Sequence, residues 1–331
     1  MNIKYLKAGS GDAILIQDET HNILIDGGND FTYVRDELTK IFQAGQKLDL
    51  LIVTHHDDDH IAGVISLVQA AIRGDFGNEF IKEILANTPR KIKGTILLEE
   101  QNTFSYRQAH ILENLITTYT SNWDIVTADT PERTFGTIKL KFLSPVKEVL
   151  ETYSSAKGAY LTSDYRCDWG STMATLEKYL DDESLDRSDS NKTSIVILAE
   201  SLEKKVLLTG DCVPERLEQI LNNLQEDSPK TPVKFDYFKL PHHGSYRSLS
   251  KAVLSKIDCS KFIISTNSKK HYMPNKRTIL KVAKFIVPQK NEIEFLFNYS
   301  EPIEKLNIKP SELRKYKIKL VQNNQIYGYG T

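Results

Sequence analysis

Cysteine and long apolar runs are both scarce in this chain. Its 331 residues include three cysteines, Cys167, Cys212 and Cys259, which are widely separated and have no CxxC spacing. This set indicates neither a disulfide framework nor a zinc knuckle, and it favours a reducing cytoplasm. No apolar run reaches the length of a membrane span or of a signal-peptide core. We therefore expect a cytoplasmic location, without secretion or membrane insertion.

An excess of charge of either sign is also absent. Lysine and arginine number 43 against 44 aspartate and glutamate residues, so the formal net charge is -1. That balance gives no overall attraction to nucleic acid or to a membrane, although it can conceal an uneven distribution. The hydrophobic content of 40% is enough for a core, and a chain of this length can form one large α/β domain or two modest ones.

Candidate chemistry is concentrated between Leu51 and His60. Leu51-Ile52-Val53 predicts a short buried strand, which ends abruptly at Thr54-His55-His56-Asp57-Asp58-Asp59-His60. Imidazole nitrogens and carboxylate oxygens together suit divalent transition ions, and two pairs of ligands could serve two neighbouring ions. So many titratable groups at one strand end would repel one another unless cations neutralised them. A solvated acidic turn is the alternative interpretation.

The rest of the first half reads as strands and helices around this stretch. We predict strands over residues 3–6, 13–16, 23–25, 50–53, 79–86 and 137–143, and helices over residues 31–43, 61–68 and 103–120. Asp26 lies at a strand end, where it can brace a neighbouring loop or serve as an ordinary turn residue. Residues 146–190 are acidic and irregular, which indicates an inserted helix and loop.

The second half repeats the order of hairpin, helix and strand. Strands are predicted over residues 191–198, 206–211 and 235–240, with a helix over residues 214–224. The hairpin ends at Asp211, and the last strand ends in Pro241-His242-His243-Gly244-Ser245. Ligands from both halves that meet at one edge would form a two-ion site. Packing or capping is the alternative for the histidine pair. We interpret residues 291–331 as a small terminal strand extension.

These motifs together resemble a known superfamily. Thr54-His55-His56-Asp57-Asp58-Asp59-His60, Leu208-Thr209-Gly210-Asp211 and Pro241-His242-His243-Gly244-Ser245 look like the motifs of the metallo-β-lactamase fold superfamily. The opening Ala8-Gly9-Ser10-Gly11-Asp12-Ala13 is similar to the branch that contains the hydrolase domain of the competence protein ComEC. The resemblance implies a single αββα sandwich domain over residues 1–331, with a metal site on one edge of two packed sheets. It also implies hydrolysis by a metal-bound hydroxide, with nucleases and phosphodiesterases prominent among the activities.

The resemblance further implies which residues hold the ions. His55 and Asp57 would bind one ion, Asp59 and His60 would bind the other, and Asp211 would bridge the two.

The remaining positions carry the departures from the superfamily pattern. His243 would bind the second ion, His242 would bind metal or substrate phosphate, and Asp26 would support the loop without being a ligand. Asp57 and Asn191 stand where many members have histidine. Oxygen ligands in place of imidazole shift the preference away from zinc and toward manganese, iron or magnesium. We expect two divalent ions, manganese or zinc, with one position weaker than the other.

Asp59 and His271 are the candidate catalytic residues. His271 lies in Lys270-His271-Tyr272-Met273-Pro274, where the ComEC-like branch tends to carry a histidine-containing loop. We hypothesise that His271 protonates or binds the leaving group. A surface histidine is the alternative interpretation.

The distribution of charge indicates a phosphate-bearing substrate. Residues 230 to 290 contain fourteen lysines and arginines against two acidic residues. Such a segment is typical of a phosphate-binding surface. Its plausible substrate contacts are Tyr246, Arg247, Lys269, Lys270 and Tyr272. The alternative is that these lysines lie on solvated faces and balance the acidic residues 146–190.

Two classes of function follow. The first is a metal-dependent nuclease or phosphodiesterase that acts on nucleic acid or another phosphodiester, with a possible protein partner in a processing or defence complex. The second is a regulatory subunit that keeps the fold without turnover. Cyclic nucleotides and phosphorylcholine esters are further possible substrates, and β-lactams or thioesters suit an oxygen-rich site least.

Overall fold

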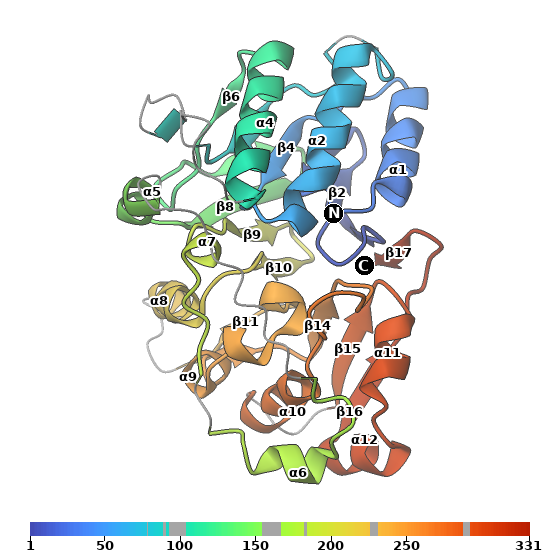
Figure 1. Cartoon of the computed structure of the whole chain (residues 1–331), viewed down its shortest axis with the longest axis vertical. Helices are drawn as coiled ribbons and strands as arrows, with labels where there is room; N and C mark the ends of the chain where they lie inside the picture. The colour runs from blue at the N-terminus through green and yellow to red at the C-terminus, as the bar shows by residue number, and fades with distance from the viewer. Residues whose placement is uncertain are drawn as a thin grey trace.

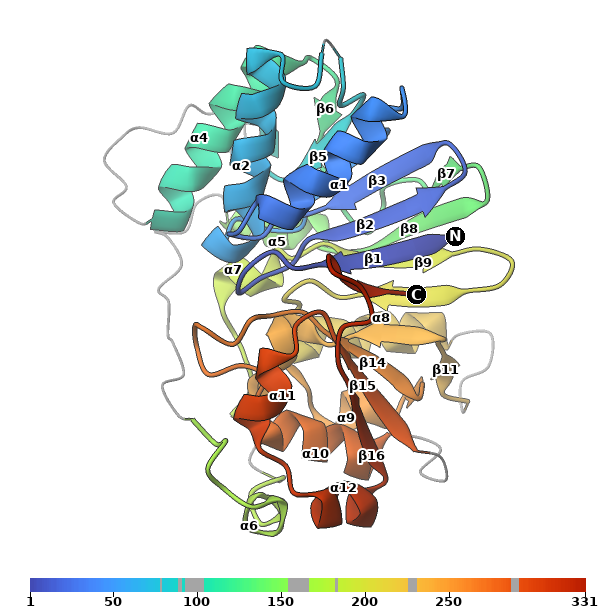
Figure 2. The same cartoon turned by 90° about the vertical axis from the view of Figure 1, so that its right-hand side faces the viewer.

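Two large β-sheets pack face to face, and helices cover the outer face of each (Figures 1 and 2). The computed structural model describes residues 1–77, 79–88, 91–92, 104–153, 167–181, 184–225, 231–286 and 292–331. Three buried apolar clusters fill the spaces between the four layers. Among the helices of the described ranges, none is both long and apolar enough to cross a membrane. The predicted αββα sandwich is confirmed.

The first sheet carries the amino-terminal half of the chain and has seven strands. Their order is β17 (Gly328–Gly330), β1 (Asn2–Leu6), β2 (Ile14–Asp18), β3 (His21–Ile25), β4 (Leu50–Val53), β5 (Ile84–Ala86) and β6 (Trp123–Asp124). Its outer face packs against α1 (Thr32–Gln43), α2 (Asp58–Arg73) and α4 (Phe104–Tyr119). Strands β3, β4, β5 and β6 are parallel, so their carboxyl ends meet at one edge.

The second sheet has eight strands. Their order is β16 (Ile318–Val321), β15 (Ile293–Phe297), β14 (Lys261–Ile264), β12 (Tyr237–Lys239), β10 (Lys205–Leu208), β9 (Val196–Glu200), β8 (Ile138–Ser144) and β7 (Arg133–Phe135). Its outer face packs against α6 (Met173–Glu177), α8 (Pro214–Leu224), α9 (Lys251–Leu254), α10 (Lys276–Phe285), α11 (Glu301–Leu306) and α12 (Pro310–Tyr316). A small separate sheet pairs β11 (Val233–Lys234) with β13 (Ile257–Asp258).

Alternation along the strands explains why both faces of each sheet are buried. In β2, Ile14 and Ile16 enter the core between the sheets, whereas Leu15 packs under the helices. In β9, Ile197 faces the inner core and Leu198 the outer one. Successive side chains of a strand point to opposite faces, so continuous apolar runs are required where both faces are covered.

Several element boundaries differ from the sequence prediction. Helix α2 begins at Asp58, so Asp59 and His60 lie in its first turn. The strand predicted from residue 191 begins at Val196, and residues 189–192 form the helical turn α7 (Asp189–Lys192). Polar Asp, Ser and Asn side chains compete for backbone hydrogen bonds and favour such turns over strands. The strand predicted over residues 79–86 is regular only in β5.

The two segments predicted as additions to the sandwich also differ from expectation. Residues 291–331 supply β15 and β16 to one large sheet and β17 to the other. Strand β17 pairs with β1, so the two ends of the chain lie side by side (Figure 2). Of the acidic segment, the described parts include α5 (Lys147–Tyr153), α6 and the start of α7. Residues 154–166 and 182–183 of that segment lie outside the described residues.

Two glycines place the start of α2 against the end of β3. Gly27 donates its backbone N–H to the carbonyl of His60 at 2.9 Å, and Gly63 donates to Gly28 at 2.8 Å. A Cβ atom added at Gly63 would lie 2.0 Å from the carbonyl oxygen of Gly27. This approach is possible only without side chains, and it fixes His60 next to the strand edge.

We predict that Gly63→Ala destabilises the protein by about 1–3 kcal/mol, as overpacking does in other cores. Helix propensity alone would make the same change stabilising by up to about 1 kcal/mol. Because the backbone oxygen of Gly27 cannot move away as a side chain can, packing should outweigh propensity. Urea unfolding measures the effect. Gly170→Ala is the control, since a Cβ there would meet nothing within 4 Å. A more stable Gly63→Ala protein would contradict this account.

Candidate metal centre

The carboxyl ends of strands from both sheets meet at one edge and carry the predicted site residues. Asp26 follows β3, the residues from His55 follow β4, and Asp211 follows β10. The histidine pair follows β12, in the short 3-10 helix η1 (Pro241–Gly244). The halves are joined there by the backbone, because Ile195 donates its N–H to the carbonyl of Thr54 at 3.0 Å.

The carboxylate of Asp211 lies in the middle of four imidazole rings. Its Oδ1 lies 3.4 Å from Nε2 of His60. Its Oδ2 lies 3.6 Å from Nε2 of His243, 3.7 Å from Nε2 of His242 and 3.9 Å from Nε2 of His55. All four rings therefore present the same nitrogen, Nε2, to one carboxylate.

Residues at the edge of the first sheet contact Nδ1 of two of these rings, those of His55 and His60. Asp26 is fully buried, and its Oδ2 accepts from Nδ1 of His60 at 2.7 Å. The same carboxylate accepts from the backbone N–H and the hydroxyl of Thr54. The Thr54 hydroxyl also lies 3.1 Å from Nδ1 of His55. Asp26 is thus the brace that the resemblance implied, and it directs Nε2 of His60 toward Asp211.

The other two rings are held by the second sheet and its loops. Nδ1 of His243 donates to the carbonyl of Ser265 at 2.9 Å. Nδ1 of His242 lies 3.3 Å from Oδ2 of Asp186 and 3.2 Å from Nδ2 of Asn191. In each ring the second nitrogen is left to face the centre, which is the arrangement found in metal-binding histidines.

The inner atoms of this cluster fit a divalent cation. Within the described residues, Nε2 of His55, His60 and His243 and Oδ1 of Asp211 are buried without a hydrogen-bond partner. Buried polar atoms in folded proteins are nearly always paired, so several unpaired atoms around one carboxylate need another partner. Imidazole nitrogen and carboxylate oxygen are ligands of divalent transition ions. These residues therefore fit a divalent metal ion, as the sequence predicted.

The two aspartates at the start of α2 lie on opposite sides of the cluster. Oδ2 of Asp57 is 3.6 Å from Nε2 of His55, and its Oδ1 accepts from the hydroxyl of Ser190 at 2.7 Å. Oδ2 of Asp59 is 3.3 Å from Nε2 of His243. The structure thus brings all seven predicted ligands together. It places His55 beside Asp57 and His243 beside Asp59.

Sequence reasoning missed two buried partners, Asp12 and Lys239. Asp12 belongs to a group of four candidate ligands, with His60, Asp211 and His243, whose ligand atoms lie within 4.8 Å of one another. The ammonium of Lys239 pairs with Oδ2 of Asp12 and donates to the carbonyl of Gly210 at 2.9 Å. Because this lysine neutralises Asp12, we interpret Asp12 as a support for His243, whose Nδ1 is 3.6 Å away.

Removal of one partner of the Lys239–Asp12 ion pair should lower the stability of the protein more than removal of both. Lys239 and Asp12 are fully buried, so Lys239→Met leaves an unpaired buried carboxylate, a change that costs about 3–5 kcal/mol in known cases. We predict a loss of that size in the free energy of unfolding. The double variant Lys239→Met/Asp12→Asn should recover most of it. Equal losses in the single and double variants would show that the ion pair is not the cause.

Protons and cations compete for the imidazoles of this centre. Burial alone would lower the pKa of His243, but Asp211, Asp12 and Asp59 together raise it to about 10. Burial is likewise outweighed at His60, where Asp211 and Asp26 hold the pKa well above its ordinary value. The pKa of Asp211 itself lies well below its ordinary value, because the surrounding histidines outweigh the effect of burial.

We predict that metal binding releases protons and strengthens as the pH rises from 6 to 8. A histidine with a raised pKa carries a proton in this range, and the ion must displace it. The apparent binding enthalpy, measured by titration calorimetry, should therefore depend on the ionisation enthalpy of the buffer. An enthalpy that is the same in phosphate and Tris buffers would contradict the prediction.

The predicted substrate contacts do not all reach the surface. Tyr246 is only 2% exposed, and the guanidinium of Arg277 lies 3.6 Å from its ring centroid. The expectation that its ring stacks on a base is therefore wrong. Arg247 is half-buried, and its Nε donates to the carbonyl of Ser184. Lys269 is exposed, as is Lys270, whose ammonium lies 3.2 Å from Asp58 beside the candidate ligands.

The basic segment is less exposed than its composition suggested. Among its cations that the structure describes, four are buried: Lys239, Lys276, Arg277 and Lys281. Two more, Lys256 and Lys284, form ion pairs with Glu218 and Glu177. The charge of this segment is therefore partly structural, and the counted excess overstates the phosphate-binding surface.

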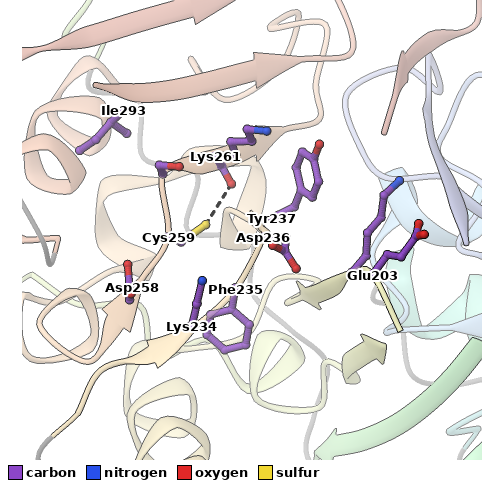
Figure 3. Close-up of a pocket in the computed structure, with 11 residues that line it drawn as sticks. Glu203, Lys234, Phe235, Asp236, Tyr237, Asp258, Cys259, Lys261 and Ile293 are labelled. Atoms are coloured by element: carbon purple, nitrogen blue, oxygen red, sulfur yellow. Dashed lines mark hydrogen bonds between the residues drawn. The ribbon is translucent and has the colours of Figure 1, made fainter. Parts of the chain in front are cut away.

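A cavity elsewhere in the molecule is separate from this centre. It has a volume of about 510 Å³ and is lined by Lys234, Tyr237, Asp258, Cys259 and Lys261, among others (Figure 3). These residues lie at the amino ends of β12 and β14, whereas the histidine pair and Ser265 follow the carboxyl ends of the same strands. Burial raises the pKa of the Cys259 thiol to about 12, so this cysteine is not an activated nucleophile.

Comparisons with known proteins agree with this geometry in part. The model of the Metallo-beta-lactamase superfamily matches residues 6–93, which include β2 to β5 and the candidate ligands from His55 to His60. No curated protein matches the chain significantly.

Solved structures show distant likenesses. Zn(2+)-bound PqqB from Methylobacterium extorquens is 12% identical with a TM-score of 0.45, over 100% of this chain and 99% of that one. The metallo-beta-lactamase fold protein YhfI from Bacillus subtilis is 12% identical with a TM-score of 0.41, over 80% and 85%. A diphosphatase from the PhnP family is 11% identical with a TM-score of 0.42, over 86% and 93%.

Likeness at this level indicates no substrate, and the ComEC-type branch stays a prediction. The superfamily model covers residues 6–93 of this chain, and the observed αββα fold is consistent with that match.

Proposed function

We propose that this protein is a metal-dependent hydrolase that cleaves phosphodiester bonds. One observation carries the proposal: four imidazole Nε2 atoms lie within 3.9 Å of the buried carboxylate of Asp211, and three of them are buried without a hydrogen-bond partner in the described residues. Two divalent ions held there would lower the pKa of a water molecule and offset charge that develops on the phosphate.

The remaining chemistry belongs to side chains around the centre. Asp59 faces Nε2 of His243 at 3.3 Å, and its pKa lies below the ordinary value because His243 and His60 outweigh burial. It therefore stays ionised and can orient a water molecule by accepting its hydrogen bond. This is the catalytic role that we propose for Asp59 beyond metal binding.

His271 is proposed to bind the leaving group. It is half-buried, and burial lowers its pKa, with smaller effects from the nearby Asp59, His242 and His243. A neutral imidazole at pH 7 is a weak proton donor, so hydrogen bonding to the leaving oxygen fits it better than full protonation. Its backbone has φ of 60° and that of Tyr272 has φ of 52°, a left-handed pair that the surrounding loop must hold in place.

A phosphodiester suits the polar groups at the mouth of the site. Lys269 and Lys270 directly precede His271 in the sequence, and Tyr272, which follows it, is 43% exposed. Two cations and an exposed aromatic ring are suited to a phosphate and an attached base. Nucleic acid is the first substrate class to test, in which a protein partner of a processing or defence complex would be an additional component. Cyclic nucleotides and phosphorylcholine esters are the small alternatives.

A regulatory subunit without turnover is the second candidate function. The observation that favours it is Asn191, which stands where many superfamily members have a metal-binding histidine. Its Nδ2 donates to Asp186 at 2.7 Å, and its Oδ1 is buried without a hydrogen-bond partner among the described residues. An amide is a weaker ligand than an imidazole for zinc, so one ion position could be too weak for catalysis.

The test is turnover of labelled single-stranded and duplex DNA, RNA, cyclic nucleotides and phosphorylcholine esters, with manganese, zinc or magnesium added separately. We expect manganese-stimulated cleavage of a phosphodiester, and Asp211→Ala and Asp59→Ala should each lower kcat at least 100-fold, as loss of a metal bridge and of a water-orienting group does. Asp189→Ala, an exposed change on α7, is the matched control. Metal binding without cleavage of any substrate would favour the regulatory subunit. Undiminished activity in Asp211→Ala would mean that another site is responsible.

A further inference from the structure

The acidic segment, residues 146–190, contains a carboxylate, that of Asp186, which contacts the candidate ligand His242. Asp186 lies just before α7, and its backbone N–H donates to the carbonyl of Arg247 at 2.8 Å. Its Oδ1 accepts from the backbone N–H of Ser188 at 2.9 Å, and its Oδ2 accepts from Nδ2 of Asn191 at 2.7 Å. These contacts fix the carboxylate, and Oδ2 then lies 3.3 Å from Nδ1 of His242.

His242 needs such a partner more than the other rings of the cluster do. The side chain of His242 is 27% exposed, whereas those of His55 and His60 are fully buried and that of His243 is 4% exposed. Packing therefore restricts His242 least.

Two polar atoms lie near Nδ1 of His242: Oδ2 of Asp186 at 3.3 Å and Nδ2 of Asn191 at 3.2 Å. Of the two, only the carboxylate oxygen can accept a proton from Nδ1. A carboxylate that accepts from Nδ1 keeps the proton on that nitrogen and leaves a lone pair on Nε2. Nε2 of His242 lies 3.7 Å from Oδ2 of Asp211, on the side of the ring opposite to Asp186. Asp186 therefore contacts the nitrogen of His242 that faces away from Asp211, and it is not itself a ligand.

The same segment also braces a second candidate ligand. Ser190, four residues after Asp186, donates its hydroxyl to Oδ1 of Asp57 at 2.7 Å. The other oxygen of Asp57 lies 3.6 Å from Nε2 of His55. Asp186 and Ser190 thus support His242 and Asp57, whereas His243 and His60 are supported by Ser265 and Asp26. The supports of His242 and Asp57 therefore lie close together in the acidic segment.

We propose that Asp186 is a positioning residue that holds His242 as an Nε2 ligand and so sets the occupancy of the ion position shared with His55 and Asp57. The proposal rests on the metal-dependent site described above and deepens it. It assigns His242 to the first ion and His243 to the second, and it gives the acidic segment a role in selecting whether one or two ions bind.

The experiment compares Asp186→Ala, Asp186→Asn and the control Asp189→Ala by equilibrium dialysis against manganese and zinc with elemental analysis. We expect the wild type and Asp189→Ala to bind two ions. Asp186→Ala should bind one ion with unchanged affinity and the other 10- to 100-fold more weakly, as removal of such a partner does in known metal sites. Asp186→Asn should be intermediate, because an amide oxygen can still accept from Nδ1.

Two further measurements make the mechanism testable without turnover. In cobalt-substituted protein, Asp186→Ala should alter the visible absorption of one of the two ions only. In a His242→Ala background, Asp186→Ala should cause no further loss of affinity, since the ring through which it acts is gone.

Equal stoichiometry and affinity in Asp186→Ala and wild type would overturn the proposal, as would a loss of the same size in the His242→Ala background. These readouts concern binding alone, so absence of phosphodiester cleavage would refute the proposed hydrolase activity and leave this proposal standing.

Discussion

The structure depends on one buried carboxylate, that of Asp211, at the edge where the two sheets meet. An isolated charge in such a place would be several kcal/mol unfavourable, so the surrounding chain must offset it. Four imidazole rings do so, from the turn after β4, the first turn of α2 and the segment after β12, each with Nε2 toward the carboxylate. These rings come from both halves of the chain. The requirement to surround Asp211 therefore fixes the register of strand ends that are more than 150 residues apart in sequence.

A buried ion pair between Lys239 and Asp12 also links the two halves of the chain. Lys239 lies in an otherwise apolar strand and reaches Asp12 of the first half and the carbonyl of Gly210. The ammonium of Lys239 next to a candidate metal site would by itself disfavour binding of a cation. It makes sense because Asp12 would otherwise add one more negative charge to a centre that already contains Asp57, Asp59 and Asp211. With Asp12 neutralised, the remaining carboxylates and the imidazoles form a group that fits a divalent cation.

The sequence allowed prediction of the fold and of the candidate ligands that meet at one edge, because these residues lie in short motifs at strand ends. It did not allow prediction of Asp12, Lys239 or Asp186. Asp12 read as part of a glycine turn, Lys239 as one cation of a basic segment, and Asp186 as one residue of an acidic insertion. Their roles depend on burial and on partners far away in sequence, which charge counting does not reveal. One signal was present for Lys239: a lysine between Phe238 and Leu240, directly before the histidine pair, is unusual for a buried strand.

The same limit applies to recognition of the substrate. Lys276 and Lys281 are buried and donate to backbone carbonyls of Trp169, Ser171, Tyr246 and Leu249. They hold loops together and cannot attract a phosphate from solution. The cations that remain at the mouth of the site, Lys269 and Lys270, lie beside His271 at a single loop. Composition alone therefore could not show that the excess of basic residues in this segment is partly structural, because it does not distinguish a buried lysine from an exposed one.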